Sequence, residues 1–201
     1  MRISHKHKFI FFAVPKTGST TIRKCLDIYS DVIAIGDVES PLYWHVKPPV
    51  LKKYFEEQHW NWNEYFKFAF VRNPWDYVVS MYAYRSRLGK AGSFYMNNPE
   101  MFQWLREATP YNFKKYLKHR PYCTGKQIFY TDGCDFVGKL ENLQQDFNTV
   151  CDRIGIPRQQ LPHRNMTEHK HYTEYYDDET RDIITTIYKE EIQKFGYVYG
   201  E

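Results

Sequence analysis

A run of apolar residues near the start of the chain gives way to a helical apolar pattern across a short polar turn. The run, from Phe9 to Ala13, predicts a buried strand. Beyond the turn, apolar residues recur at spacings of three and four, which places them on one helix face: Ile22, Cys25, Leu26 and Tyr29. The pattern therefore predicts a strand, a tight turn and an amphipathic helix, in that order.

The same order recurs further along the chain. Residues 66–71 are typical of a second strand, and Arg72 stands at its tip. Pro74 suits the first turn of a helix, and the apolar face of that helix comprises Trp75, Val78, Val79 and Tyr82. A second strand, polar tip and helix are therefore predicted, with Ser80 on the helix eight residues after Arg72.

Strands and helices are predicted to alternate along the whole chain. Strands are expected at residues 8–14, 32–36, 66–71, 127–131 and 135–140, and helices at 20–29, 49–58, 75–87, 99–118, 142–154 and 178–195. This alternation predicts an α/β fold, in which a parallel sheet is flanked by helices on both faces. Ligands of such sheets bind beyond the carboxyl ends of the strands, which is where the two polar turns fall.

Length and composition agree with a single domain over residues 1–201. The chain is 42% hydrophobic and 26% charged, as is usual for a globular enzyme. No apolar run approaches the ~20 residues of a membrane span, and the first apolar stretch is too short for a signal peptide. A cytoplasmic location is therefore expected. Cys123 and Cys134 flank a loop and would form a disulfide only in an oxidising compartment.

The first polar turn has the composition of an anion site. It carries Lys16 and Gly18 together with four hydroxyl side chains: Thr17, Ser19, Thr20 and Thr21. Because the N-terminus of a helix exposes unpaired N–H groups, a phosphate or sulfate group can be held there. A Walker-type P-loop needs lysine directly after its second glycine, whereas Lys16 precedes Gly18 by two residues. The alternative interpretation is a structural turn whose hydroxyl groups cap the helix.

The order Pro-Lys-Thr-Gly-Ser-Thr-Thr at residues 15–21 resembles the 5′-phosphosulfate loop of sulfotransferases that use 3′-phosphoadenosine-5′-phosphosulfate (PAPS). This resemblance implies a P-loop-like nucleotide-binding sulfotransferase fold, with the co-substrate bound by residues 16–21. It also implies that Lys16 contacts the sulfate group and the bridging oxygen.

The segment around Arg72 resembles the same family's 3′-phosphate motif, R-x7-S. The resemblance implies that Arg72 and Ser80 both bind the 3′-phosphate of the nucleotide. A guanidinium group can pair with phosphate through two charge-assisted hydrogen bonds, and a serine hydroxyl can add a third contact. The alternative is a surface pair between Arg72 and Asp76, with Ser80 as a buried helix residue.

Two later segments extend the resemblance to nearly the whole chain. Residues 135–143 resemble the family's strand-to-helix junction, FVG-R/K-x-E-N-L. Residues 161–165 and 175–180 are similar to the C-terminal signature of small Golgi-type and bacterial carbohydrate sulfotransferases. These segments are interpreted as structural first, with His163 and Asn165 as candidate residues lining the nucleotide site.

Sulfuryl transfer needs a base for the acceptor proton, and the resemblance implies His45. This residue lies between the two anion motifs and resembles the histidine that is the proposed base of glycan sulfotransferases. An ordinary histidine pKa of about 6.5 suits that role. An ordinary loop histidine is the alternative, and His163, Glu39 and Glu64 are rival bases. The chemistry requires no metal.

The expected function is in-line transfer of a sulfuryl group from PAPS to a hydroxyl of a carbohydrate or glycolipid, which leaves adenosine 3′,5′-bisphosphate. Aromatic residues between the motifs suit sugar stacking or core packing: Trp44, Trp60, Trp62 and Tyr65. The net charge of +4 allows an anionic glycan, and no nucleic acid partner is needed to explain the anion motifs. The alternatives are a nucleotide or small-molecule kinase, which uses ATP with magnesium, and a non-catalytic module that binds the bisphosphate.

Overall fold

The computed structural model describes residues 1–34, 36–90, 109–119, 125–162 and 170–201. The chain divides into two compact units. The first comprises residues 1–72 and 127–165, and the second comprises residues 73–126 and 166–201. The expectation of a single domain over residues 1–201 stays a prediction.

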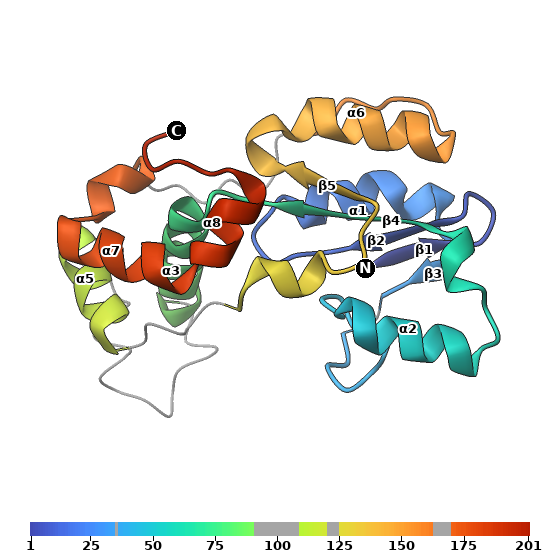
Figure 1. The fold of residues 1–201 in the computed structure, drawn as a ribbon, viewed down its shortest axis with the longest axis horizontal. Helices are drawn as coiled ribbons and strands as arrows, with labels where there is room; N and C mark the ends of the chain where they lie inside the picture. Colours follow the sequence, from blue (N-terminus) through green and yellow to red (C-terminus); the bar gives the residue numbers. More distant parts are fainter. Residues whose placement is uncertain (35, 91–108, 120–124, 163–169) are drawn as a thin grey trace. The chain divides into compact units, whose positions relative to one another are not determined.

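A sheet forms the centre of the first unit (Figure 1). Its strands within the described residues lie in the order β3-β1-β2-β4-β5, with bounds β1 Arg2–Ser4, β2 Phe9–Phe12, β3 Val32–Ile33, β4 Phe66–Val71 and β5 Phe136–Lys139. β2, β4 and β5 run parallel, whereas β1 is antiparallel to both β2 and β3. The predicted α/β class is confirmed, but the sheet is mixed rather than wholly parallel.

Helices cover both faces of this sheet. α1 (Ser19–Leu26) and α6 (Leu143–Ile154) pack on one face, and α2 (Pro48–Glu57) packs on the other (Figure 1). The alternation of side chains along β2 explains this arrangement, because Phe11 joins the core with α1 and α6 while Phe12 joins the core with α2. Short 3₁₀ helices complete the unit: η1 Asp27–Tyr29, η2 Trp62–Glu64, η3 Gln127–Tyr130 and η4 Leu140–Asn142.

Helices are the only regular elements among the described residues of the second unit. Its elements are α3 Pro74–Lys90, α5 Pro110–His119, η5 Tyr172–Tyr175, α7 Asp178–Ile187 and α8 Lys189–Phe195. Aromatic rings form much of its core, where Phe113 meets Tyr82 and Tyr175 at centroid distances of 5.3 and 5.7 Å. A capping box in which Asp177 and Thr180 exchange hydrogen bonds begins α7.

The structure corrects several predicted elements. Residues 127–131 are not a strand, because η3 takes up most of them and β4 already has a strand on each side. β1 has no counterpart among the predicted strands, since three residues are too few to show an alternating pattern. The helix predicted at 178–195 is interrupted at Tyr188. Part of the helix predicted at 99–118 lies outside the described residues.

Two further expectations concern the environment of the chain. Among the described residues, no helix is both long enough and apolar enough to cross a membrane. Cys123 lies outside the described residues, and the Cys134 thiol lies 3.6 Å from the Tyr130 carbonyl oxygen that it can donate to. The pairing of these two cysteines stays a prediction.

Candidate functional site

The turn between β2 and α1 alternates the sign of its backbone φ angles. Lys16 and Gly18 have positive φ values of 62° and 72°, and Thr17 lies between them. Alternation of this kind turns successive N–H groups toward one side and forms an anion-binding nest. Gly18 is also the N-cap of α1 and supplies no capping side chain. The N–H groups of Ser19 and Thr20 therefore meet no capping side chain and suit a ligand, whereas the Thr21 N–H donates to the Gly18 carbonyl oxygen over 3.0 Å.

The hydroxyl groups of the turn differ in their roles. Thr17 is fully buried, and its hydroxyl donates to the Val14 carbonyl oxygen over 3.0 Å. That side chain therefore holds the turn, and its contribution to an anion site would come from the backbone. Ser19 and Thr21 are also buried, whereas Thr20 is partly exposed.

The junction between β5 and α6 packs directly behind the turn. A Cβ atom at Gly18 would lie 3.1 Å from the nearest methyl carbons of both Leu140 and Leu143. Within the junction, Gly138 is more tightly confined, since a Cβ there would lie 2.5 Å from the Phe70 ring. The motif at residues 135–143 thus has a structural role, because it supports the turn at residues 13–18 between β2 and α1. We call this turn the anion turn, after the ligand predicted for it. The sequence indicated the motif but not this contact.

Arg72 meets the anion turn at the carboxyl edge of the sheet. It follows the last residue of β4, and β4 is the parallel neighbour of β2. Its guanidinium Nη1 donates to the Lys16 carbonyl oxygen over 3.4 Å. Two motifs that are 56 residues apart are therefore joined directly, as expected for strand ends at one edge of a parallel pair.

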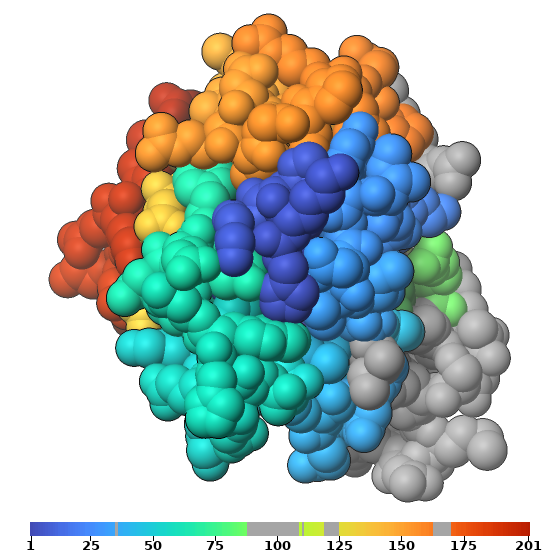
Figure 2. All heavy atoms as spheres, turned by 90° about the vertical axis from the view of Figure 1, so that its right-hand side faces the viewer, coloured from blue at the N-terminus to red at the C-terminus, as the bar shows by residue number. Residues whose placement is uncertain are grey.

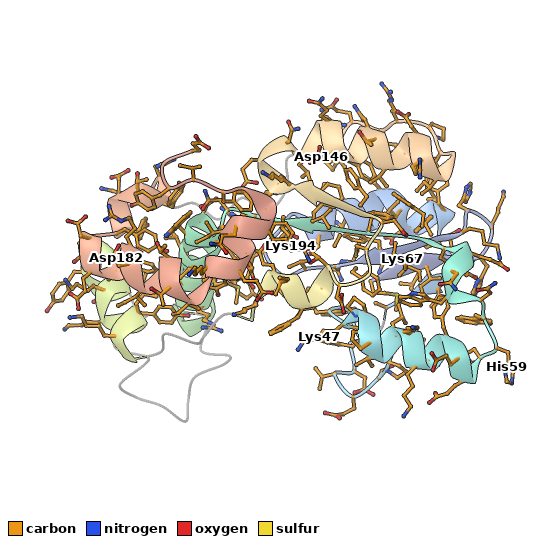
Figure 3. The ribbon with its side chains drawn as sticks, viewed as in Figure 1. Lys47, His59, Lys67, Asp146, Asp182 and Lys194 are labelled. Carbon is orange, nitrogen blue, oxygen red and sulfur yellow. The ribbon has the colours of Figure 1, made fainter. Side chains whose placement is uncertain are left out.

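Lys139 ends the third parallel strand at the same edge. It pairs in register with Val71, the residue before Arg72. Its backbone N–H donates to the Asp146 carboxylate over 2.7 Å, and Asp146 lies in the first turn of α6 (Figure 3). Three cationic residues thus lie at or just after the carboxyl ends of the adjacent parallel strands β2, β4 and β5: Lys16, Arg72 and Lys139.

His45 is anchored to the strand that leads into the anion turn. Its Nδ1 lies 2.6 Å from the carbonyl oxygen of Ala13, the residue after β2. Because a carbonyl oxygen only accepts, Nδ1 carries the proton in the neutral ring and Nε2 is the acceptor. Burial lowers the pKa of His45 below 6.5, although the bond to Ala13 opposes this effect. At neutral pH the imidazole is therefore uncharged, and the lone pair that can accept a proton is on Nε2.

Ser80 lies in the second unit. It is a fully buried residue of α3, the helix that begins two residues after Arg72. The predicted position on a helix is therefore confirmed, while its role in binding a phosphate stays a prediction.

Comparison with known protein families identifies the family of this chain. The model of the sulfotransferase family matches residues 1–198. The chain belongs to the sulfotransferase family. Its relatives include carbohydrate sulfotransferase 10 of Xenopus laevis, which is 27% identical over 151 residues, or 72% of this chain and 39% of the relative.

Two other relatives show different coverage. Carbohydrate sulfotransferase 14 of Danio rerio is 23% identical over 189 residues, which cover 78% of this chain and 48% of the relative. An uncharacterized protein of Archaeoglobus fulgidus is 33% identical over 116 residues, which cover 58% of this chain and 83% of the relative. The matched region thus spans less than half of the length of the two named relatives. No solved structure matches it significantly.

The rival candidates for the base lie elsewhere or outside the described residues. Glu64 precedes β4, at the edge opposite Arg72, and pairs with Lys8 over 2.9 Å. Figure 2 shows this side of the molecule, where the turn after β1 lies beside the segment that precedes β4. Glu39 is exposed between β3 and α2. His163, like Asn165, falls outside the described residues.

The aromatic residues between the two motifs divide into two groups. The rings of Trp60, Trp62 and Tyr65 meet Phe55 of α2 edge-on, at centroid distances between 5.1 and 5.2 Å. These three rings belong to the core on that face of the sheet. Trp44 differs, because it is 43% exposed and lies next to His45 in the sequence. It is the most exposed of the four, and its indole N–H donates to the Ala34 carbonyl oxygen over 3.1 Å while Arg23 lies 5.7 Å from the ring centroid.

Proposed function

We propose that this member of the sulfotransferase family transfers a sulfuryl group from PAPS to a hydroxyl group of a carbohydrate or glycolipid. The observation that carries the proposal is the hydrogen bond between the Arg72 guanidinium and the Lys16 carbonyl oxygen. It joins a backbone nest to a bidentate anion binder, and a nucleotide with phosphate groups at both ends of its ribose needs both.

The two motifs would bind different parts of the donor. Lys16, the N–H groups of residues 17–20 and the hydroxyl of Thr21 suit the 5′-phosphosulfate, since the helix N-terminus adds a favourable dipole. Arg72 and Ser80 suit the 3′-phosphate, as the resemblance to the R-x7-S motif implies. After transfer, the same groups would bind adenosine 3′,5′-bisphosphate.

The proposed reaction is an in-line displacement at sulfur. The acceptor oxygen forms a bond to sulfur while its proton passes to Nε2 of His45. The bond from sulfur to the bridging oxygen breaks, and its electron pair stays on the 5′-phosphate of the departing bisphosphate. Lys16 and the helix N–H groups would stabilise that developing charge, which is the main catalytic contribution expected for a group transfer of this type.

The acceptor class rests on two observations. The named relatives are carbohydrate sulfotransferases, and the exposed indole of Trp44 adjoins the proposed base. A flat aromatic face can pack against the apolar face of a sugar ring.

Ligand-induced stabilisation tests the assignment of the nucleotide. At a hundredfold excess over its dissociation constant, a ligand adds about 2.7 kcal/mol to the free energy of unfolding. Adenosine 3′,5′-bisphosphate is therefore expected to raise the melting temperature far more than adenosine 5′-monophosphate at equal concentration. Equal shifts would contradict the role of Arg72 and Ser80. Turnover of ATP with magnesium, in place of transfer from PAPS, would instead identify a kinase.

A further inference from the structure

Gln127 lies at the end of β4 although it belongs to no strand. It is the first residue of η3, and its side chain is fully buried. A buried amide requires hydrogen-bond partners, and these partners are on the backbone of Arg72.

The Gln127 amide exchanges two hydrogen bonds with one residue. Its Oε1 accepts from the Arg72 backbone N–H, and its Nε2 donates to the Arg72 carbonyl oxygen, each over 2.8 Å. Because one partner only donates and the other only accepts, the orientation of the amide is fixed. The side chain therefore bonds Arg72 as a neighbouring strand would bond one residue of its ladder.

This contact begins where the sheet ends. The last residue of β4 in register with β5 is Val71, opposite Lys139, and β2 pairs with β4 only as far as Ala69. Arg72 is therefore beyond both ladders. The two bonds from Gln127 therefore hold the Arg72 peptide groups beyond the last paired residue of β4, and the direction of the guanidinium depends on that backbone.

We propose that Gln127 is a positioning residue for recognition of the 3′-phosphate. Its amide holds the Arg72 backbone so that the guanidinium stays beside the anion turn, where it donates to the Lys16 carbonyl oxygen. Gln127 thereby sets the preference for a nucleotide with a 3′-phosphate without touching the nucleotide. This inference rests on the proposed function.

The test compares two nucleotides in the Gln127→Ala variant. The affinities for adenosine 3′,5′-bisphosphate and adenosine 5′-monophosphate are measured by calorimetry. The affinity for the bisphosphate is expected to fall about tenfold or more, since the loss of a correctly placed charged partner has effects of that size. The affinity for the monophosphate is expected to stay within about twofold. A merely structural role would weaken both alike.

Gln144→Ala is the matched control. Gln144 of α6 also binds backbone through its amide, because its Nε2 donates to the Gln159 carbonyl oxygen over 2.9 Å and its Oε1 accepts from the Leu161 N–H over 2.8 Å. Its amide bonds Asn148, Gln159 and Leu161, none of which belongs to the anion turn, so its removal is expected to leave the ratio of the two affinities unchanged. Gln127→Glu provides a near-isosteric second variant, which retains the acceptor but loses the donor, and the same selective loss is expected.

Arg72→Ala separates the two proposals. If it leaves the preference for the bisphosphate intact, the proposed function fails. If it removes the preference but folded Gln127 variants keep it, only the role of Gln127 is overturned. In the double variant, removal of Gln127 is expected to add no further loss, because both changes act through one contact. Independent, additive losses would overturn the inference.

Discussion

The fold sets both the tautomer and the pKa of His45. The pKa determines how the rate of the proposed transfer depends on pH. The Ala13 carbonyl oxygen holds the proton on Nδ1, and burial lowers the pKa below 6.5. A base acts when it is unprotonated. Transfer is therefore expected to rise with pH to a plateau, with a midpoint below 6.5, so that the rate is flat near neutral pH. A pH profile of kcat with a carbohydrate acceptor measures this.

His45→Ala is expected to lower kcat by about 10²- to 10⁴-fold and to remove the acidic limb of the profile. Affinity for the bisphosphate is expected to persist, because the anion turn and Arg72 remain. His7→Ala is the control, since His7 also places Nδ1 near a backbone carbonyl oxygen, that of Ile154, but lies before β2 rather than after it. A folded His45→Ala variant with normal transfer would remove His45 from the mechanism.

At the scale of elements, α1 depends on the glycine at its N-cap. Gly18 has φ of 72°, and a Cβ there would lie 3.1 Å from Leu140 and Leu143. Gly18→Ala is therefore expected to lower the free energy of unfolding by about 1 to 3 kcal/mol, through backbone strain and this close contact. Denaturant titration measures the change.

Gly155→Ala separates those two causes. Gly155 ends α6 with φ of 69°, and a Cβ there would meet nothing within 4 Å. It carries the strain without the contact, so its substitution is expected to cost less than that of Gly18. Equal losses would mean that Leu140 and Leu143 yield freely and that the junction does not support the anion turn.

The elements with long apolar patterns were predictable from the sequence, and the short ones were not. β2, β4 and the helices that follow them agree with the spacing of their apolar residues. η3 contains apolar residues typical of a strand, but a strand also needs a neighbouring strand with an unpaired edge. No local sequence pattern shows whether such an edge exists. Gln127 was missed for a related reason, because its contact with Arg72 joins residues 55 positions apart.

At the scale of the whole molecule, the family and the α/β class were predictable because the motifs extend along almost the entire chain. The family model likewise matches residues 1–198. The direction of the first strands was not predictable in the same way. β1 and β3 are antiparallel partners, and nothing in three residues or in two indicates which neighbour they pair with.

The left-handed backbone of Lys16 affects the stability of the entire chain. A non-glycine residue in that region costs about 1 to 2 kcal/mol, most of which glycine avoids. Lys16→Gly is therefore expected to have a free energy of unfolding about 1 kcal/mol higher than that of Lys16→Ala, and so a higher denaturant midpoint. Both variants lack the amine, and both are expected to lose transfer. Equal midpoints would show that φ of 62° carries no strain here. If the midpoints differ as expected, Lys16 lowers the stability of the chain. The destabilising residue is then the one that the proposed mechanism places beside the leaving group.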